Sequence, residues 1–141
     1  MNKLLVIGIT ATLGGFTCAA FAQAHSAKNE ISTAHAHAMM AQSATSVAMA
    51  HTHLQHVINC LVGPGGSGFE AAAGTPCKDQ GNGAIPDAAS DHALHAKLEN
   101  ALSDAQAGLK SESLAAVQQD AGKAAAGLQD GSAAKASSSS W

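Results

Sequence analysis

The chain has 141 residues and a formal net charge of −3, and it contains neither arginine nor tyrosine. Because nothing forms the basic stripe that a phosphate backbone requires, the composition argues against nucleic-acid binding. Aromatic residues make up only 3% of the chain, which excludes a large aromatic core. Alanine is abundant and is the best helix former, so the composition favours a thin bundle of closely packed helices.

The N-terminus has the layout of a secretory signal peptide. Lys3 supplies the positive charge, residues 4–17 form a mostly apolar stretch, and residues 20–24 contain two small-x-small cleavage motifs. The apolar stretch is too short for a comfortable membrane span. We therefore predict that residues 1–24 are removed on export to a bacterial periplasm and that no membrane segment remains.

A long helical segment follows the signal. Residues 26–61 contain neither Gly nor Pro and predict helix throughout. Hydroxyl residues near position 44 favour helix caps over helix interiors. The segment is therefore either one long helix or two helices joined near residue 44. Its predicted core-facing positions recur at steps of three and four: Met40, Ser43, Val47, Ala50, Leu54, Val57 and Leu61.

Residues 62–86 are rich in Gly and Pro and predict an irregular loop. Removal of Cys18 with the signal would leave Cys60 and Cys77 as a pair, for which an oxidising compartment favours a disulfide. The alternative interpretation makes both cysteines thiolate ligands for a soft metal. A disulfide would pin the loop to the preceding helix, and we expect Phe69 to pack against the bundle.

Two further helices are expected after the loop. The first has Asp87 or Ser90 as its N-cap and ends at Gly108, a predicted C-cap. Ser111 would then cap a last helix that reaches about residue 128. The predicted fold is all-α, a small antiparallel bundle of three or four helices with a Gly-rich loop pinned by the disulfide. The predicted domain order is a signal peptide at 1–24, the helical bundle at 25–131 and a disordered Ser-rich tail at 132–141.

The eight histidines indicate metal binding, since imidazole is the commonest protein ligand for transition metals. His53 and His56 lie three residues apart, so they are neighbours on one helix face, and His92 and His95 repeat this spacing. In an antiparallel hairpin both pairs are expected at the same depth below the connecting loop. Facing helices could then supply up to four ligands to one ion.

The break near residue 44 decides which other histidines could join. In a continuous helix His35 would lie about 24 Å from His51 and could not share its site, whereas a turn would bring the two level. Three methionines could add thioether ligands, which suit Cu(I): Met39, Met40 and Met49. The predicted metal ligands are His53, His56, His92, His95, His51, His35 and His37.

The run His51-Thr52-His53-Leu54-Gln55-His56 and the helix pair around Gly108 resemble the small, His-rich, Ala-rich helical metal-binding proteins of bacterial periplasms, the small metal-binding protein type. The resemblance covers about residues 30–130 and implies buffering or scavenging of divalent copper, nickel or zinc. The chain departs from that pattern in its Gly-rich loop with Cys60 and Cys77. We predict a periplasmic protein that buffers, scavenges or delivers a transition metal, copper first and zinc or nickel next.

Two other classes of function stay open. A helical bundle could hold a non-covalent haem through a His and a Met, although the chain has few large apolar residues to wall a haem. The protein could also be an envelope interaction or stress protein whose histidines are incidental. No catalytic motif is present, so we predict no enzyme. A homodimer and an unidentified protein partner are compatible with the sequence.

Overall fold

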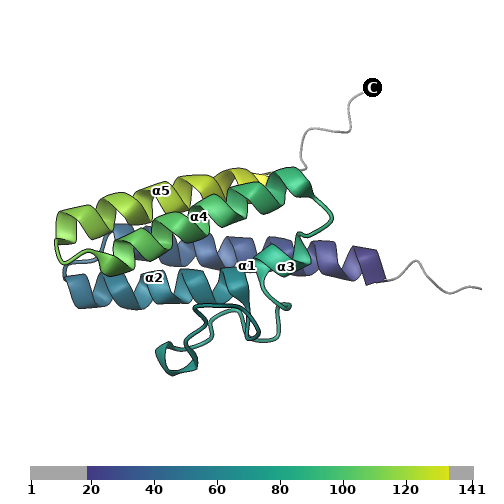
Figure 1. Cartoon of the computed structure of the whole chain (residues 1–141), viewed down its shortest axis with the longest axis horizontal. Helices are drawn as coiled ribbons and strands as arrows, with labels where there is room; N and C mark the ends of the chain where they lie inside the picture. Colours follow the sequence, from purple (N-terminus) through teal and green to yellow (C-terminus); the bar gives the residue numbers. More distant parts are fainter. Residues whose placement is uncertain (1–18, 134–141) are drawn as a thin grey trace, which may run out of the picture.

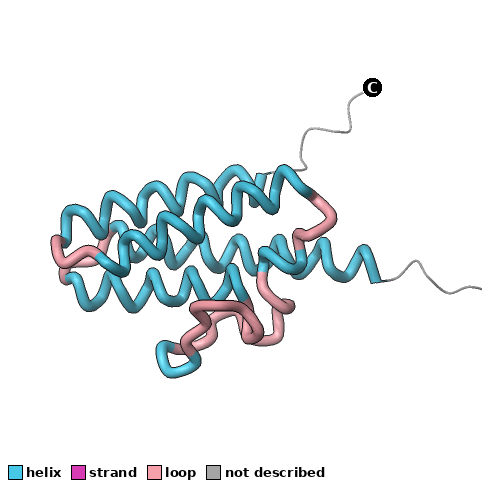
Figure 2. The backbone as a smooth tube through the Cα atoms, viewed as in Figure 1, coloured by secondary structure: helices cyan, strands magenta, loops and turns pink. Residues whose placement is uncertain are grey.

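The computed structural model describes the backbone of residues 19–133 and the side chains of residues 27–129. No strand occurs among the described residues, so the predicted all-α bundle is confirmed. The predicted signal peptide and Ser-rich tail lie largely outside this range. The long helices are α1 (Ala19–Gln42), α2 (Val47–Val62), α4 (His92–Lys110) and α5 (Leu114–Ala133), and the α2–α4 connection carries the 3-10 turn η1 (Ala71–Ala73) and the short helix α3 (Ala84–Asp87) (Figures 1 and 2).

A turn of residues 43–46 separates α1 from α2, so the segment forms two helices and not one. Ser46 is the N-cap of α2, and its side chain accepts a hydrogen bond from the backbone N–H of Met49 at 3.2 Å. Gln118 of α5 donates to the carbonyl of Ala44 at 2.9 Å and so ties the turn to the bundle. Within the described chain, no helix combines the length and apolar content needed to cross a membrane.

The core is built largely from alanine, which lets the helices approach closely. Met40 was expected on the core-facing stripe but is 48% exposed, because the stripe of α1 passes through Ala38 and Ala41 instead. In α2 the predicted stripe is buried from Ala50 onward. Larger apolar side chains from the other helices fill the space between the alanines: Leu54, Leu61, Leu98, Val117 and Leu128.

The two ends of the loop after α2 lie side by side. Gly63 ends α2 with φ +68°, and a Cβ on Gly83 would approach the Gly63 nitrogen to 2.6 Å. Cys60 and Cys77 form the predicted disulfide, with Cα atoms 5.3 Å apart. The alternative of two thiolate ligands therefore does not apply to this oxidised pair. Phe69 packs against the core, as predicted.

Helix α4 begins later than predicted. Its N-cap is Asp91, whose carboxylate accepts the backbone N–H of Leu94 at 3.0 Å, and not Asp87 or Ser90. The carboxylate of Asp87 is engaged by Asn82, whose backbone and side-chain N–H groups both donate to it at 3.1 Å. The chain thus forms α3 and a short turn before α4 starts.

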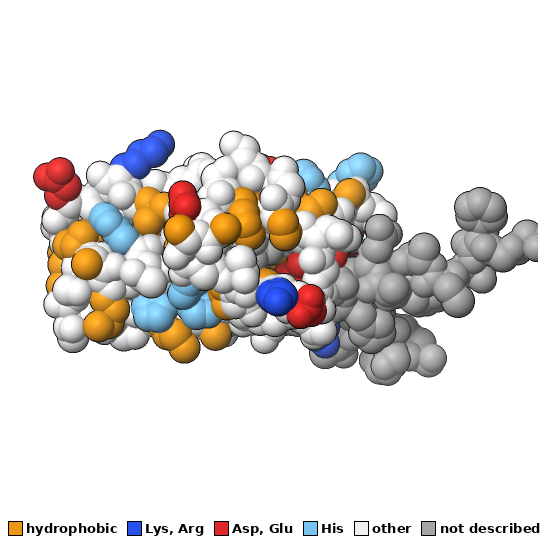
Figure 3. Space-filling view, turned by 90° about the horizontal axis from the view of Figure 1, so that it is seen from below, with side chains coloured by type: hydrophobic (Ala, Val, Ile, Leu, Met, Phe, Trp, Pro, Cys, Tyr) orange, Lys and Arg blue, Asp and Glu red, His pale blue; other side chains and the backbone are white. Residues whose placement is uncertain are grey.

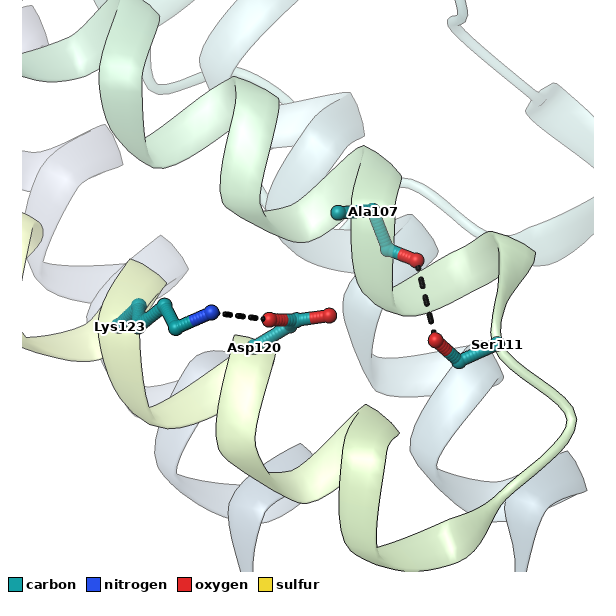
Figure 4. Close-up of polar contacts among 4 residues, drawn as sticks. All are labelled: Ala107, Ser111, Asp120 and Lys123. Atoms are coloured by element: carbon teal, nitrogen blue, oxygen red, sulfur yellow. Dashed lines mark hydrogen bonds and ion pairs between the residues drawn. The ribbon is translucent and has the colours of Figure 1, made fainter.

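Helix α4 also ends later than predicted. Gly108, the expected C-cap, lies inside the helix and is buried against α2, where a Cβ would approach Leu54 Cδ1 to 2.6 Å. The helix ends near Ser111, whose hydroxyl donates to the carbonyl of Ala107 at 3.5 Å (Figure 4). Gly108 therefore permits close helix packing and does not reverse the chain. Helix α5 begins at Leu114, slightly after the predicted cap at Ser111.

Candidate metal centre

Three histidines from two helices converge on the flank where α1 packs against α2. His37 Nδ1 lies 3.2 Å from His53 Nδ1 and 3.3 Å from His56 Nδ1. One ligand atom of each residue lies within 4.8 Å of the other two, and all three side chains are half-buried. These residues, His37, His53 and His56, are called the histidine cluster below.

The spacing of the cluster fits a tetrahedral metal ion. Bonds of about 2.0–2.1 Å to imidazole nitrogens place two ligands of a tetrahedron about 3.3 Å apart. The His37–His53 and His37–His56 contacts already have this length, at 3.2 and 3.3 Å. A rotation of side chains must bring His53 and His56 to the same separation. Three protein ligands would leave a fourth position for water or an exchanging ligand.

A backbone carbonyl fixes the orientation of one ring. His56 Nε2 lies 2.7 Å from the oxygen of Ala73, and because a carbonyl only accepts, Nε2 must carry the proton. The Nδ1 atom of His56 therefore presents a lone pair to His37. The proton in that contact lies on His37 Nδ1, where an entering metal ion would displace it. A ring whose second nitrogen donates to a carbonyl is typical of metal-bound histidine.

Asn59 holds the loop in the position that this contact needs. It is 3% exposed, and its side-chain nitrogen donates to the carbonyls of Glu70 at 2.8 Å and Gly74 at 2.7 Å. Its side-chain oxygen accepts the backbone N–H of Glu70 at 2.9 Å. Gly74 has φ +105°, and a Cβ there would approach His56 Nε2 to 3.1 Å. The segment around η1 is thus fitted closely over the His56 ring.

The surroundings favour the neutral form of His37 and His53. Burial, followed by the positive charges that His56 and His53 would carry, lowers the pKa of His37 from 6.5 to about 4. Burial, and then His56, lowers the pKa of His53. A neutral imidazole is the form that binds a metal ion, so these shifts leave ligand lone pairs available.

The structure does not bring His35 and His51 to the cluster, although both are level with it. Residues two apart on a helix point about 200° apart, so His35 and His51 lie on the opposite flanks from His37 and His53. His51 Nε2 instead contacts the carbonyl of Ser111 at 3.0 Å, beyond the end of α4.

His92 and His95 lie far from the cluster, so the common depth expected for the two pairs does not occur. Gly108 packs against Leu54, and His95 lies 13 residues earlier on α4, about 20 Å along the helix axis. The reason is that α3 and the following turn carry the chain along α1 beyond the end of α2 before α4 starts. Histidine side chains accordingly form separate groups on the face shown in Figure 3.

The supporting residues were not predicted from the sequence. Asn59 has a recognisable signal, since it is a polar residue inside the apolar run Val57–Val62, and such a buried amide needs hydrogen-bond partners. The role of the Ala73 carbonyl has no sequence signal, because every residue has a backbone oxygen.

Comparison of the chain with protein-family models, curated proteins and solved structures finds no match. The resemblance to small periplasmic metal-binding proteins therefore stays a prediction.

Proposed function

We propose that this protein binds one transition-metal ion through His37, His53 and His56 and buffers, scavenges or delivers that metal in a bacterial periplasm. The observation that carries the proposal is the convergence of three Nδ1 atoms, two of whose separations are 3.2 and 3.3 Å, the edge length of a tetrahedral site. The hydrogen bond from His56 to Ala73 supports it, because it orients a ligand before any metal arrives.

Copper is the metal we propose first, with zinc and nickel as the alternatives. Nitrogen donors bind Cu²⁺ more tightly than Ni²⁺ or Zn²⁺ in the usual order of divalent affinities. Met40 and Met49, each 48% exposed, come one helical turn after His37 and one turn before His53. Their thioethers would suit Cu(I), so the same flank offers donors for both copper oxidation states.

A handling role is favoured over a structural one. The cluster is half-buried on the surface of the bundle, so an ion held there stays open to ligand exchange. The fold itself is supported by its alanine-rich core and by the disulfide. The predicted signal peptide and the disulfide agree with an oxidising compartment outside the cytoplasm.

Calorimetric titration with Cu(II), Zn(II) and Ni(II) tests the site. The wild type should bind one ion per chain, and the H37A/H53A/H56A variant should lose that binding. A matched variant, H35A/H92A/H95A, removes as many histidines and should bind as the wild type does. Binding that survives in the first variant, or disappears in the second, would show that the site is elsewhere.

Elemental analysis of untagged protein purified from its native host tests the choice of metal. Copper near one equivalent per chain is expected. Zinc or nickel at that level, without copper, would be consistent with the proposed site but would show that copper is the wrong metal.

A further inference from the structure

The methionines differ from the other large apolar residues of the molecule in their exposure. Met39, Met40 and Met49 are 47%, 48% and 48% exposed, and they are the exposed large hydrophobic side chains of the described chain. Apolar side chains that gather on a surface often mark a binding site. The thioether of methionine is also a soft, polarizable metal ligand. Their positions relative to one another therefore decide whether they form a site.

Met40 and Met49 lie opposite each other on the two helices that carry the histidine cluster. The 3.2 Å contact between His37 and His53 shows that these two positions are level on α1 and α2, which the turn of residues 43–46 connects. Met40 comes three residues after His37, and Met49 comes four residues before His53. Both steps lead towards the same turn and advance about 4.5–6 Å along antiparallel helices. Met40 and Met49 are therefore also level, one helical turn from the cluster.

Both of these methionines lie on the same flank as the cluster. Residues three or four apart are neighbours on a helix surface, so Met40 adjoins His37 and Met49 adjoins His53. Methionine has three rotatable bonds, which allow sulfur atoms from two neighbouring helices to reach a common ion. Met39 is turned about 100° from Met40 around α1, so it does not share this flank.

The chain around this pair offers soft donors and no charged ones. From Ile31 to Phe69 the sequence contains no Asp, Glu, Lys or Arg. The nearest acid along α1 is Glu30, which lies about 15 Å from Met40 along the helix axis. Glu30 is buried and accepts the backbone N–H of Gly83, and burial is the main cause that raises its pKa from 4.5 to about 7. A hard cation, which prefers carboxylate oxygens, finds no such ligand on this part of α1 and α2.

We propose that Met40 and Met49 form a second metal site, which binds Cu(I) one helical turn from the histidine cluster. Thioether sulfur is a soft donor and selects Cu(I). An imidazole of the cluster is the next nearest donor and would complete the coordination. The methionine site does not depend on metal binding by the cluster. A consequence that does rest on the proposed function is that this flank would hold copper in either oxidation state, each at its own position.

Titration of the exported protein with silver nitrate in a chloride-free buffer tests the site, because Ag(I) is a soft monovalent ion like Cu(I) and is stable in air. The disulfide leaves neither Cys60 nor Cys77 as a thiol that would bind silver. NMR of the methionine methyl groups reports which thioethers bind. The methyl signals of Met40 and Met49 should shift with Ag(I) and saturate, while the signal of Met39 should stay in place.

Substitutions separate the pair from the neighbouring methionine. Met40→Leu with Met49→Leu keeps apolar side chains of similar volume at exposed helix positions, so the fold should be retained. We expect this double variant to bind Ag(I) at least about 10-fold more weakly, since loss of an outer-shell partner alone costs a metal site that much. Met39→Leu, at an equally exposed position, should bind Ag(I) as the wild type does. Both variants should keep the Zn(II) affinity of the wild type.

Three results would overturn the proposal: no shift of the Met40 and Met49 methyl signals with Ag(I), undiminished Ag(I) binding by the double variant, or an equal loss of Ag(I) binding in Met39→Leu. The H37A/H53A/H56A variant distinguishes this proposal from the function proposed above. Methyl shifts that persist in that variant would support the methionine site even if the cluster of the wild type bound no Zn(II). Zn(II) binding by the wild type without methyl shifts under Ag(I) would support the cluster and overturn the methionine site.

Discussion

Two pairs of histidines with the same spacing have different fates in this molecule. His53 and His56 on α2 meet a third imidazole, His37 of α1, and one of their rings is held by a backbone carbonyl. On α4, His92 is exposed and His95 is half-buried, and neither belongs to a cluster of possible ligands within the described chain.

The comparison shows that the spacing of two histidines along a helix does not by itself make a metal site. A separation of three residues places two rings on one helix face, and this holds for both pairs. A metal site also needs a neighbouring helix that presents a donor at the same level, and an outer partner that orients a ring. Only the α2 pair has both.

The largest expected effect comes from removing one pair at a time. We expect H53A/H56A to weaken metal binding by at least about 100-fold, since loss of ligands should exceed the loss of an outer-shell partner. H92A/H95A should bind as the wild type does. Competition with a chelator of known affinity measures the metal affinity of both variants. Similar losses of affinity in the two variants would show that the α2 pair is no more important for metal binding than the α4 pair.

The next effect concerns the support of His56. Asn59→Ala removes three hydrogen bonds to the loop. We expect metal affinity to fall by roughly 10–100-fold and the free energy of unfolding to fall by about 1–3 kcal/mol. Thr52→Ala, at an exposed position of the same helix, is the control. Unchanged affinity in Asn59→Ala would mean that the Ala73 carbonyl does not matter for the site.

The disulfide should affect stability more than affinity. Cys60→Ser with Cys77→Ser opens a loop of 17 residues, which should lower the free energy of unfolding by about 3 kcal/mol. Metal affinity should fall less than in Asn59→Ala, because the Asn59 hydrogen bonds still hold the segment over His56. Urea unfolding and metal competition measure the two quantities. A larger loss of affinity in this variant than in Asn59→Ala would indicate that the disulfide, and not Asn59, keeps the loop in position over His56.

The smallest effect concerns the free energy of unfolding of the metal-free protein, to which His37 and Glu30 contribute opposite pH dependences. The pKa of His37 is lowered from 6.5 to about 4, so the unfolded chain binds its proton first and stability falls as pH drops from 6.5 towards 4. The pKa of Glu30 is raised from 4.5 to about 7, so the folded chain keeps its proton and stability falls as pH rises from 4.5 towards 7.

Single variants should expose each slope. Between pH 4.5 and 6.5 the two contributions oppose each other in the wild type. Glu30→Gln should become more stable as pH rises through this range, and His37→Asn should become less stable. Urea unfolding with a chelator present measures both, and slopes of the same sign would contradict the assignments.

Much of the fold follows from local chemistry in the sequence. The hydroxyl residues near position 44 marked a possible helix break, and Ser46 is indeed the N-cap there. The pair Cys60 and Cys77 and the Gly-rich run between them indicated a pinned loop, and Phe69 was its evident anchor. Each of these features depends on residues close in the chain, so sequence alone identifies them.

The composition of the cluster depends on helix register, which sequence alone does not determine. The placement of His92 and His95 follows from α3, a single short turn whose length shifts the whole of α4. Gly108 seemed a helix terminator, but its role depends on the approach of Leu54 from another helix. His37 was one of seven predicted ligands, and only the packing of α1 on α2 distinguishes it from His35.

The contact between Gly63 and Gly83 gives the protein a modular construction. Because the two ends of the loop are adjacent, residues between them can be inserted or deleted without moving the four long helices. A shortened chain, in which Gly63 is joined directly to Gly83, would keep the histidine cluster on α1 and α2 but would remove the loop segment that lies over His56. Changes in the length of the loop would therefore alter how the three imidazoles are covered and oriented without changing the helices that carry them.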